Sequence, residues 1–165
     1  MVTKPVLFLD VDGVLNVLGK DADGLKKREV MLQAEKYPMH FYPTRFALTF
    51  MRWAWQVFDV QWCTAWRQDA NLIAKWAGLP ERPSILIMKS NKMMDWKLEG
   101  VQNFLEGKGN PLCVWIEDGI GQEAETWVAG RENFFYVHTR FYVGVRRKHV
   151  RFLQDALKLP KASDS

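Results

Sequence analysis

Residues Val6–Asn16 read VLFLDVDGVLN, an apolar run that ends in two aspartates separated by a single residue. The run is rich in β-branched side chains and stops at an Asp-Gly turn signal, which predicts a buried strand over Val6–Val11. Side chains two residues apart in a strand leave the same face, so Asp10 and Asp12 would point to one place. Two converging carboxylates repel each other unless a cation lies between them, and a site of oxygen ligands favours Mg²⁺. The alternative is an ordinary Asp-Gly turn with a solvated neighbour.

Four further apolar runs follow along the chain, and helix-like segments lie between them. The runs are Val57–Trp62, Ile85–Met88, Cys113–Ile116 and Phe134–Val137. The segments with helical apolar spacing are Arg45–Trp55, Asp69–Trp76, Leu98–Glu106, Glu123–Ala129 and Arg147–Leu157. Nearly continuous apolar strands that alternate with helices are typical of a parallel sheet covered on both faces. The sequence therefore predicts one α/β domain over residues 1–159, a doubly wound, Rossmann-like parallel sheet of about five strands.

Turn and cap residues indicate where several of these segments begin and end. Gly78 and Gly107 each follow a helical segment, at the position where a left-handed residue is expected. Thr44 precedes the first helical segment and is placed to cap it. Residues 17–43 have no clear period, and we expect a small flap inserted after the first strand rather than a large cap. Residues 160–165 are expected to form a disordered tail.

The charge of the chain favours an anionic partner. The 165 residues carry a formal net charge of +4, and the sequence pI is about 9.1. A net positive field concentrates phosphates and nucleic acids around a protein. Lys26–Arg28 form one basic run, and residues 146–151 form a denser one that holds Arg146, Arg147 and Lys148. Solvated surface is the more common meaning of such runs.

Two observations bear on the location of the protein. Cys63 and Cys113 both lie in apolar stretches, which is typical of small core side chains rather than a disulfide or a metal pair. No apolar run approaches the ~18 residues of a membrane span, and the first residues do not look like a signal peptide. We therefore expect no membrane segment and a reducing, cytoplasmic setting.

Polar residues follow the predicted strands at the sheet edge where ligands bind in such folds. They are Asp10 and Asp12 after the first run, Thr64 after the second, Lys97 before the Leu98–Glu106 helix, and Glu117 and Asp118 after the fourth run. Taken singly, each is better explained by an ordinary turn or an exposed loop. Together they predict a phosphoryl-transfer site in which Asp118 completes a Mg²⁺ site with the aspartate pair.

The same stretches resemble the four motifs of the haloacid dehalogenase-like superfamily. Residues 7–16 (LFLDVDGVLN) are similar to its first motif, a strand that runs into Asp-x-Asp-Gly-Val-Leu. Residues 62–66 (WCTAW) resemble the second, a strand that ends in Thr or Ser, and Lys97 in residues 95–98 (DWKL) resembles the third. Residues 115–118 (WIED) resemble the fourth, and all four stand in the family's order over nearly the whole chain.

Within this superfamily the chain most resembles a small capless group named after domains of multifunctional RNA-repair proteins. Residues 62–71 (WCTAWRQDAN), residues 78–80 (GLP) and Trp96-Lys97 carry that resemblance. Glu117 departs from the group, which more often has Asp there, and Gly119 stands where a third acid is common. The departure at Glu117 puts the surroundings of the metal in question more than the metal itself, because Asp118 is retained.

The resemblance implies a role for each residue. Asp10 would be the nucleophile that forms an aspartyl-phosphate, and Asp12 would protonate the leaving oxygen and then deprotonate water. Thr64 and Lys97 would hold the non-transferring phosphate oxygens. Mg²⁺ would be bound by Asp10, the backbone carbonyl of Asp12, and Asp118, with Glu117 in support.

Several alternatives stay open at this point. Lys89 and Lys92 compete with Lys97 for the third role, although Lys97 directly precedes a predicted helix. Asn16 and Arg67 follow the first two motifs and would either touch substrate or have capping and solvated roles.

The substrate and the functional class also stay open. The phosphorylated substrate would be a nucleic-acid end or a small molecule such as a nucleotide, and the short flap and the basic charge favour the former. A receiver-like signalling module would carry its acid pair in a different order along the chain. A binding protein on the same scaffold would lack Asp10, Asp12 or Lys97.

Overall fold

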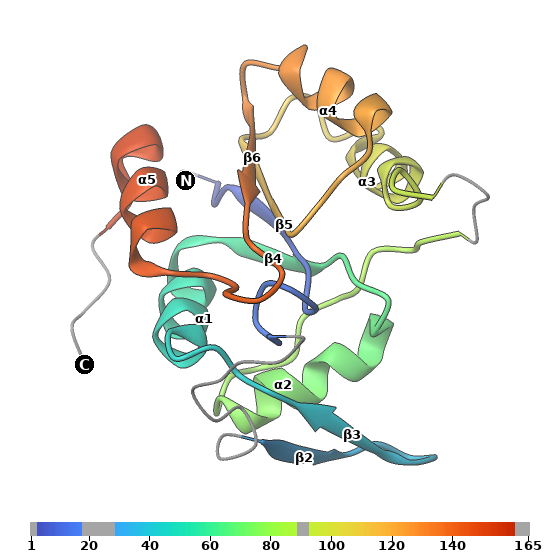
Figure 1. Cartoon of the computed structure of the whole chain (residues 1–165). Helices are drawn as coiled ribbons and strands as arrows, with labels where there is room; N and C mark the ends of the chain where they lie inside the picture. Colours follow the sequence, from blue (N-terminus) through green and yellow to red (C-terminus); the bar gives the residue numbers. More distant parts are fainter. Residues whose placement is uncertain (1–2, 18–28, 89–92, 161–165) are drawn as a thin grey trace.

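The computed structural model describes residues 3–17, 29–88 and 93–160, and within them a four-stranded parallel sheet forms the centre of the molecule (Figure 1). Its strands are β1 (Val6–Leu9), β4 (Asp59–Trp62), β5 (Cys113–Glu117) and β6 (Phe134–His138), in the order β4-β1-β5-β6. Leu9, at the end of β1, is in register with Trp62 on one side and Ile116 on the other. The carboxyl ends of three neighbouring strands therefore meet at one edge.

Helices cover both faces of this sheet. They are α1 (Ala47–Val57), α2 (Asn71–Trp76), α3 (Leu98–Leu105), α4 (Gln122–Ala129) and α5 (Arg147–Leu157), with a short 3₁₀ helix at Arg67–Ala70 before α2. Buried residues of α1, α2 and α5 form one core cluster with the sheet, and those of α3 and α4 form the second. In Figure 1, α1 and α5 lie on one side of the strands and α3 and α4 on the other. The predicted parallel α/β architecture with both sheet faces covered is confirmed.

Successive side chains of the central strand β1 enter the two cores in turn. In β1, Leu7 and Leu9 belong to the cluster of α1, whereas Val6 and Phe8 belong to the cluster of α3 and α4. Successive side chains of a strand point to opposite faces, so a strand covered on both sides must be apolar at every position. The continuous run VLFL meets that requirement, and β1 is accordingly the central strand next to the site.

The expectation of a fifth strand over Ile85–Met88 is wrong. Only an isolated bridge between Trp62 and Ser84 places this segment beside β4, with Trp62 donating to the Pro83 carbonyl at 2.8 Å and accepting from Ile85 at 2.9 Å. Pro83 has no N–H to donate, which limits the ladder at this edge. Ile85 and Ile87 are buried while Leu86 and Met88 are exposed. The segment therefore contributes to the core through one side only.

The boundary signals are partly confirmed. Gly78 and Gly107 have φ of +70° and +73°, as expected for residues that follow a helix in the left-handed region. Thr44 does not cap α1, because the helix begins at Ala47 and the Thr44 hydroxyl instead accepts from the N–H of Phe46 at 3.3 Å. Pro160, the first residue of the predicted tail, accepts through its carbonyl from the Trp53 indole at 2.9 Å. The rest of that tail lies outside the described residues.

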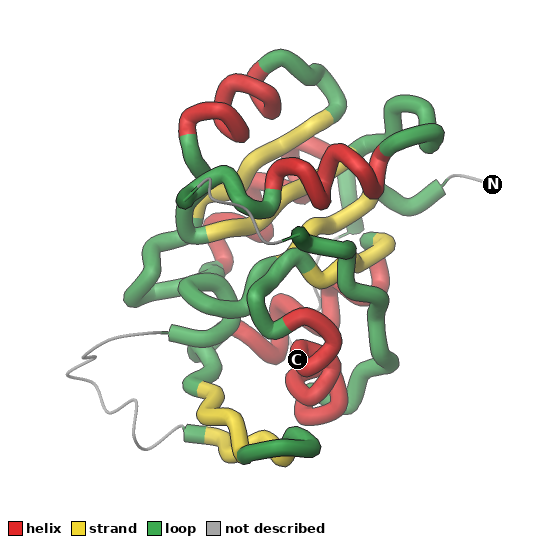
Figure 2. Tube along the Cα trace, turned by 90° about the vertical axis from the view of Figure 1, so that its right-hand side faces the viewer, coloured by secondary structure: helices red, strands yellow, loops and turns green. Residues whose placement is uncertain are grey.

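The described part of the predicted flap is an antiparallel hairpin of β2 (Val30–Gln33) and β3 (Pro38–Phe41). Figure 2 shows it at the lower end of the molecule, apart from the parallel strands. Phe41 is fully buried and makes edge-to-face ring contacts with Trp66 and Trp76, so the hairpin is held against α2 and the loop before it. The basic run Lys26–Arg28 lies outside the described residues.

Cys63 and Cys113 are buried and free, as small core side chains would be. Burial raises the pKa of both thiols, to about 12 for Cys113. Among the described residues, no helix is both long and apolar enough to cross a membrane.

Candidate active site

A buried ammonium group joins two carboxylates from neighbouring strand ends. Lys97 Nζ lies 2.9 Å from Asp10 Oδ1 and also pairs with Glu117 Oε2, and all three side chains are almost completely buried. Asp10 directly follows β1, Glu117 ends β5, and Lys97 is the residue before α3. The structure therefore brings the predicted Lys97 to Asp10, while Lys89 and Lys92 lie outside the described residues.

Burial and charge act in opposite directions on this group of residues. Burial disfavours the charged form of Lys97, but attraction to Asp10 and Glu117 outweighs it, so its pKa is raised and the ammonium stays protonated. The pKa of Glu117 is raised as well, first by burial and then by repulsion from Asp10. Lys97 can neutralise only one of the two carboxylates that it contacts, so either a proton on Glu117 or a further cation would offset the second negative charge.

Three carboxylates form a cluster that could hold that cation. One oxygen from each of Asp10, Glu117 and Asp118 lies within 4.8 Å of the others. The family resemblance implied a supporting role for Glu117 and metal binding by the backbone carbonyl of Asp12. In the structure the Glu117 carboxylate is part of the cluster and the Asp12 carboxylate is not. Metal binding by the Asp12 backbone carbonyl stays a prediction.

Asp12 is held by two side-chain donors. Asn16 Nδ2 donates to its Oδ1 at 2.8 Å, and the Trp66 indole donates to its Oδ2 at 3.1 Å. Burial raises the pKa of Asp12, the hydrogen bonds from Asn16 and Trp66 oppose that rise, and the charge of Asp10 adds to it. The chain turns after Leu9, because the Val11 carbonyl accepts from the N–H groups of residues 14–16. The strand therefore ends two residues earlier than predicted, and Asp12 reaches the site from a turn.

Asn16 is a positioning residue in this arrangement. It is 2% exposed, and besides donating to Asp12 it accepts from the backbone N–H of Tyr42 at 2.8 Å. Tyr42 directly follows β3, so the end of the hairpin and the Asp12 carboxylate are tied to the same amide. The sequence left open whether Asn16 touches substrate or has a capping or solvated role. The structure shows the Asn16 amide bonded within the protein, to Asp12 and to Tyr42.

Thr64 and Arg67 follow β4 as expected but differ in their surroundings. Thr64 is 1% exposed, and its hydroxyl accepts from the N–H of Trp66 at 3.3 Å. Arg67 is exposed and has φ of +52°, which is uncommon for a residue with a side chain. Its N–H donates to the Thr64 carbonyl at 3.1 Å, so this tight turn orients the residues after the strand. Both assigned roles toward substrate stay predictions.

Two residues that the sequence reasoning missed hold the loops of the site together. The Thr139 hydroxyl donates to the Gly13 carbonyl at 2.8 Å, and its N–H donates to the Glu117 carbonyl at 3.0 Å. The preceding His138 bonds through Nε2 to the Asp118 carbonyl at 2.8 Å. Thr139 is fully buried, and it links the loop after β1 to the end of β5. The available signal was the place of these two residues just after the fifth apolar run, at the same sheet edge.

Gly13 gives a direct test of how Asp118 is placed. Its φ is +73°, and a Cβ there would meet Asp118 Oδ2 at 2.5 Å. We expect Gly13→Ala to lower the free energy of unfolding by about 1–3 kcal/mol through backbone strain, and also to displace the Asp118 carboxylate. The matched control is Gly78→Ala, where φ is +70° but nothing lies within 4 Å. Thermal unfolding with and without Mg²⁺ should show a metal-induced rise for Gly78→Ala and little for Gly13→Ala; equal rises would contradict the placement.

No protein-family model matches the chain, and no curated protein matches it in sequence. The resemblance to the haloacid dehalogenase-like superfamily therefore remains a prediction drawn from the four motifs, and the chemistry of the site must be argued from its geometry.

Proposed function

We propose that the protein is a Mg²⁺-dependent phosphomonoester hydrolase that acts through an aspartyl-phosphate on Asp10. The observation that carries the proposal is the meeting of Asp10, Lys97, Glu117 and Asp118 at the carboxyl ends of β1 and β5. A second carboxylate, Asp12, stands two residues from Asp10 and is aimed by Asn16 and Trp66. Phosphoryl transfer needs a nucleophile, a proton carrier and positive charge close together, and these side chains supply all three.

The chemistry divides between two carboxylates. A carboxylate oxygen of Asp10 attacks phosphorus, the bond from phosphorus to the leaving oxygen breaks, and Asp12 gives that oxygen a proton. Asp12 then takes a proton from water as the water oxygen attacks phosphorus. The bond between phosphorus and Asp10 breaks, inorganic phosphate leaves, and Asp10 is restored. Because Asn16 and Trp66 each bond one oxygen of Asp12, they fix the direction in which its carboxylate can carry the proton.

Lys97 contributes positive charge to the same step. Its ammonium contacts Asp10 directly and places a donor beside the phosphate oxygens as charge develops on them. Thr64, at the end of the neighbouring strand, is proposed to donate its hydroxyl to another of these oxygens.

The three clustered carboxylates suit Mg²⁺ by their chemistry. They offer hard oxygen ligands, and their repulsion is only partly offset by Lys97. A bound Mg²⁺ would neutralise negative charge on the phosphoryl group and on the cluster. Asp10 and Asp118 would hold it, with Glu117 nearby and already paired with Lys97.

The test is a screen of the purified protein against aryl phosphates, nucleotides, sugar phosphates and phosphorylated oligonucleotides, with and without Mg²⁺. Release of inorganic phosphate and transient labelling of the protein by the phosphoryl group are expected. A protein that binds these compounds without turnover would reject the enzyme and leave a binding protein on this scaffold.

Removal of the metal should stop turnover and lower stability. At a free Mg²⁺ concentration of about 100 times its Kd, preferential binding to the native state adds about 2.7 kcal/mol to the free energy of unfolding. Asp118→Ala should weaken this dependence more than Glu117→Gln does, because Glu117 is already paired with Lys97. Asp155→Ala, on the exposed side of α5, is the matched control. Full activity in excess chelator would reject the metal site.

A further inference from the structure

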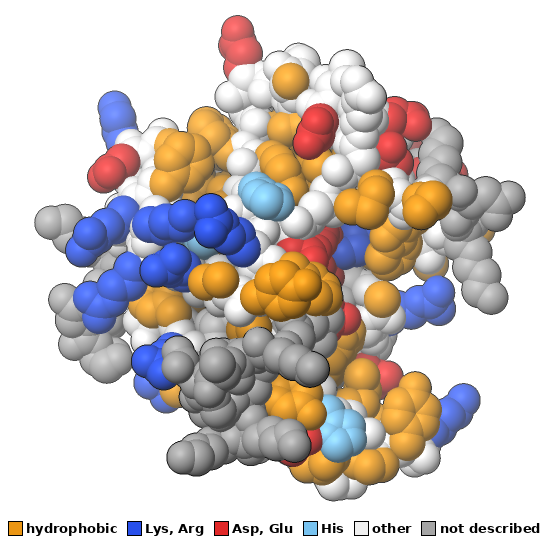
Figure 3. Space-filling view, in the orientation of Figure 1, with side chains coloured by type: hydrophobic (Ala, Val, Ile, Leu, Met, Phe, Trp, Pro, Cys, Tyr) orange, Lys and Arg blue, Asp and Glu red, His pale blue; other side chains and the backbone are white. Residues whose placement is uncertain are grey.

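A basic surface lies next to the loops of the candidate site, formed by the segment that joins β6 to α5, by the start of α5 and by the residues before α1. We call it the basic track and define it by Arg45, Arg140, Arg146, Arg147 and Lys148, all of which are exposed. In Figure 3 the Lys and Arg side chains gather in a band over the start of α5, on the face that also shows acidic side chains near its centre. The proposed hydrolysis does not require these cations.

Two adjoining hollows shape this surface. The larger, of about 730 Å³, is lined among others by Arg45, Arg146 and Arg147, and the smaller, of about 230 Å³, by Arg140, Arg146 and Lys148. Arg146 and Val143 line both, so the two hollows adjoin each other. Among the described residues that line them, none is acidic. A concave surface with charge of one sign concentrates an oppositely charged partner more strongly than a flat one.

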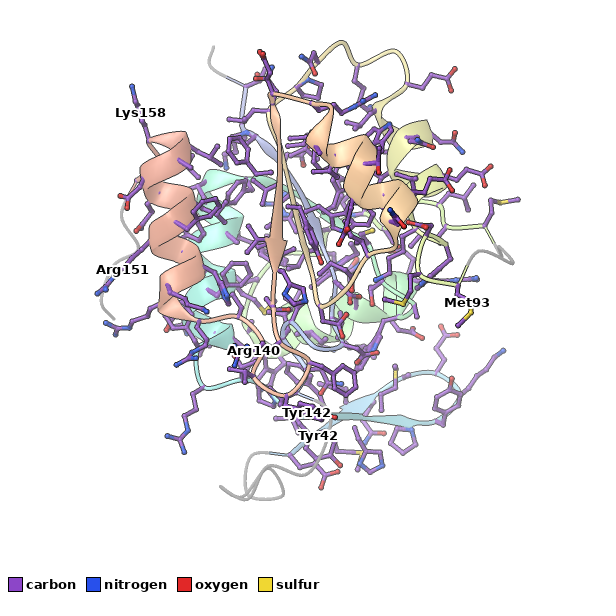
Figure 4. All side chains as sticks on the ribbon, turned by 45° about the horizontal axis from the view of Figure 1, so that its top comes forward. Tyr42, Met93, Arg140, Tyr142, Arg151 and Lys158 are labelled. Atoms are coloured by element: carbon purple, nitrogen blue, oxygen red, sulfur yellow. The ribbon has the colours of Figure 1, made fainter. Side chains whose placement is uncertain are left out.

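Aromatic side chains stand beside these cations. Tyr142 lines the larger hollow and is 66% exposed, and its ring meets that of Phe141 edge to face with centroids 5.1 Å apart. Figure 4 shows Arg140 and Tyr142 on the same loop. Exposed aromatic rings between basic residues are the features on which bases of a single strand stack while its phosphates meet the cations. A polyanion without rings would use the charge but would give the aromatic side chains nothing to stack on.

The smaller hollow adjoins the candidate site through direct contacts. His138 lines it and bonds to the Asp118 carbonyl. Gly144 also lines it, with φ of +69°, and an added Cβ there would meet the Val14 carbonyl at 2.4 Å. Val145 donates to that same carbonyl at 2.8 Å. The track therefore begins against the loop after β1 and the residue that follows β5, the two segments that carry Asp12 and Asp118.

We propose that the basic track binds a single-stranded nucleic acid whose terminal phosphate enters the site beside Asp10. The inference rests on the proposed function and names its substrate class. The cations hold the phosphodiester backbone, Tyr142 stacks on a base, and the strand end reaches the carboxylate cluster past His138.

Binding is tested separately from hydrolysis. The probe is a fluorescent twelve-nucleotide strand without a terminal phosphate, and its anisotropy reports binding to the wild type, to Arg140→Glu/Lys148→Glu and to Lys4→Glu/Lys108→Glu. The last variant makes the same charge change at exposed residues near the amino ends of β1 and β5, at the opposite sheet edge. We expect the track variant to bind at least about 30-fold more weakly than this control at equal salt.

The salt dependence of strand binding and the effect of replacing Tyr142 test the proposal in two further, independent ways. Each backbone phosphate neutralised on a single strand contributes about −0.7 to the slope of log K against log salt, so the track variant should lose about 1.4 of the wild-type slope. Tyr142→Ala should weaken strand binding by roughly tenfold and leave binding of inorganic polyphosphate unchanged, because polyphosphate has no base to stack. If the glutamate variant unfolds, Arg140→Ala/Lys148→Ala replaces it.

The hydrolysis arm compares strands phosphorylated at either end with the matching mononucleotide. In the wild type the kcat/KM of one strand should exceed that of the mononucleotide, and the ratio should fall toward one in the track variant and at high salt. Equal binding of the strand by the track and control variants would overturn the proposal that the basic track binds single-stranded nucleic acid. Binding of anionic vesicles but not of the strand would overturn it as well. Strand binding with the expected pattern but no release of phosphate would reject the proposed function alone.

Discussion

Replacing Asp10 with asparagine is expected to reduce aryl-phosphate hydrolysis by at least about 10⁴-fold while the protein stays folded. The substitution keeps the shape of the side chain but removes the nucleophilic charge, and the neighbouring Asp12 carboxylate is held by Asn16 and Trp66 instead. Initial rates in saturating Mg²⁺ and thermal unfolding measure the two halves of the prediction. A rate within a few-fold of the wild type would reject Asp10 as the nucleophile.

Asp12→Asn is the matched comparison for this result. It leaves Asp10 in place and removes only the group that moves the proton, so turnover should fall but the protein should still accept a phosphoryl group. Acid-quenched protein should then carry label in Asp12→Asn and none in Asp10→Asn. Label on Asp10→Asn and none on Asp12→Asn would instead make Asp12 the nucleophile and Asp10 the proton carrier.

The second large effect is expected at Lys97, for both stability and activity. Lys97→Met leaves Asp10 and Glu117 as buried carboxylates without their cation, and breaking a buried pair in this way costs about 3–5 kcal/mol. In a chain of 165 residues this corresponds to a fall in Tm of about 10 °C. Activity should also be lost, because the donor beside the phosphate oxygens is gone.

A double variant separates the structural role of Lys97 from its catalytic one. In Lys97→Met/Glu117→Gln one of the two orphaned charges is also removed, so much of the lost Tm should return. Hydrolysis should stay absent, because no ammonium contacts Asp10. Recovery of activity together with stability would show that Lys97 acts only as a support of the fold.

Local patterns in the sequence were sufficient for most of the framework and for the catalytic candidates. β1, β4, β5 and β6 coincide with four of the five predicted runs to within two residues at each boundary, and all five predicted helical segments contain helices. The prediction of these elements succeeds because a strand buried on both faces needs uninterrupted apolar residues, and a helix buried on one face needs the helical period. Both patterns can be recognised from neighbouring positions in the sequence. Asp10 and Lys97 were likewise placed by their positions at a strand end and a helix start.

Contacts between segments far apart in the chain could be decided only by the tertiary structure. The apolar run at Ile85–Met88 has the composition of a strand, yet Pro83 and the lack of further pairing with β4 leave it as a one-sided cover. Glu117 pairs with Lys97 and joins the carboxylate cluster because α3 brings Lys97 to the end of β5. Thr139, which also bonds to Glu117, reaches Gly13 across 126 positions of sequence, a separation at which no local period carries information.

The sequence by itself determined which residues are candidates for the proposed chemistry, because a strand followed by Asp-x-Asp-Gly is a local pattern. The tertiary structure alone decided how they are aimed and what lies beside them. Asn16 and Trp66 hold Asp12 because the hairpin packs on α2, and the basic track adjoins the site because Val145 bonds to the loop after β1. Side chains from separate segments meet only when the chain closes around its two cores, and that closure depends on the packing of the whole sheet.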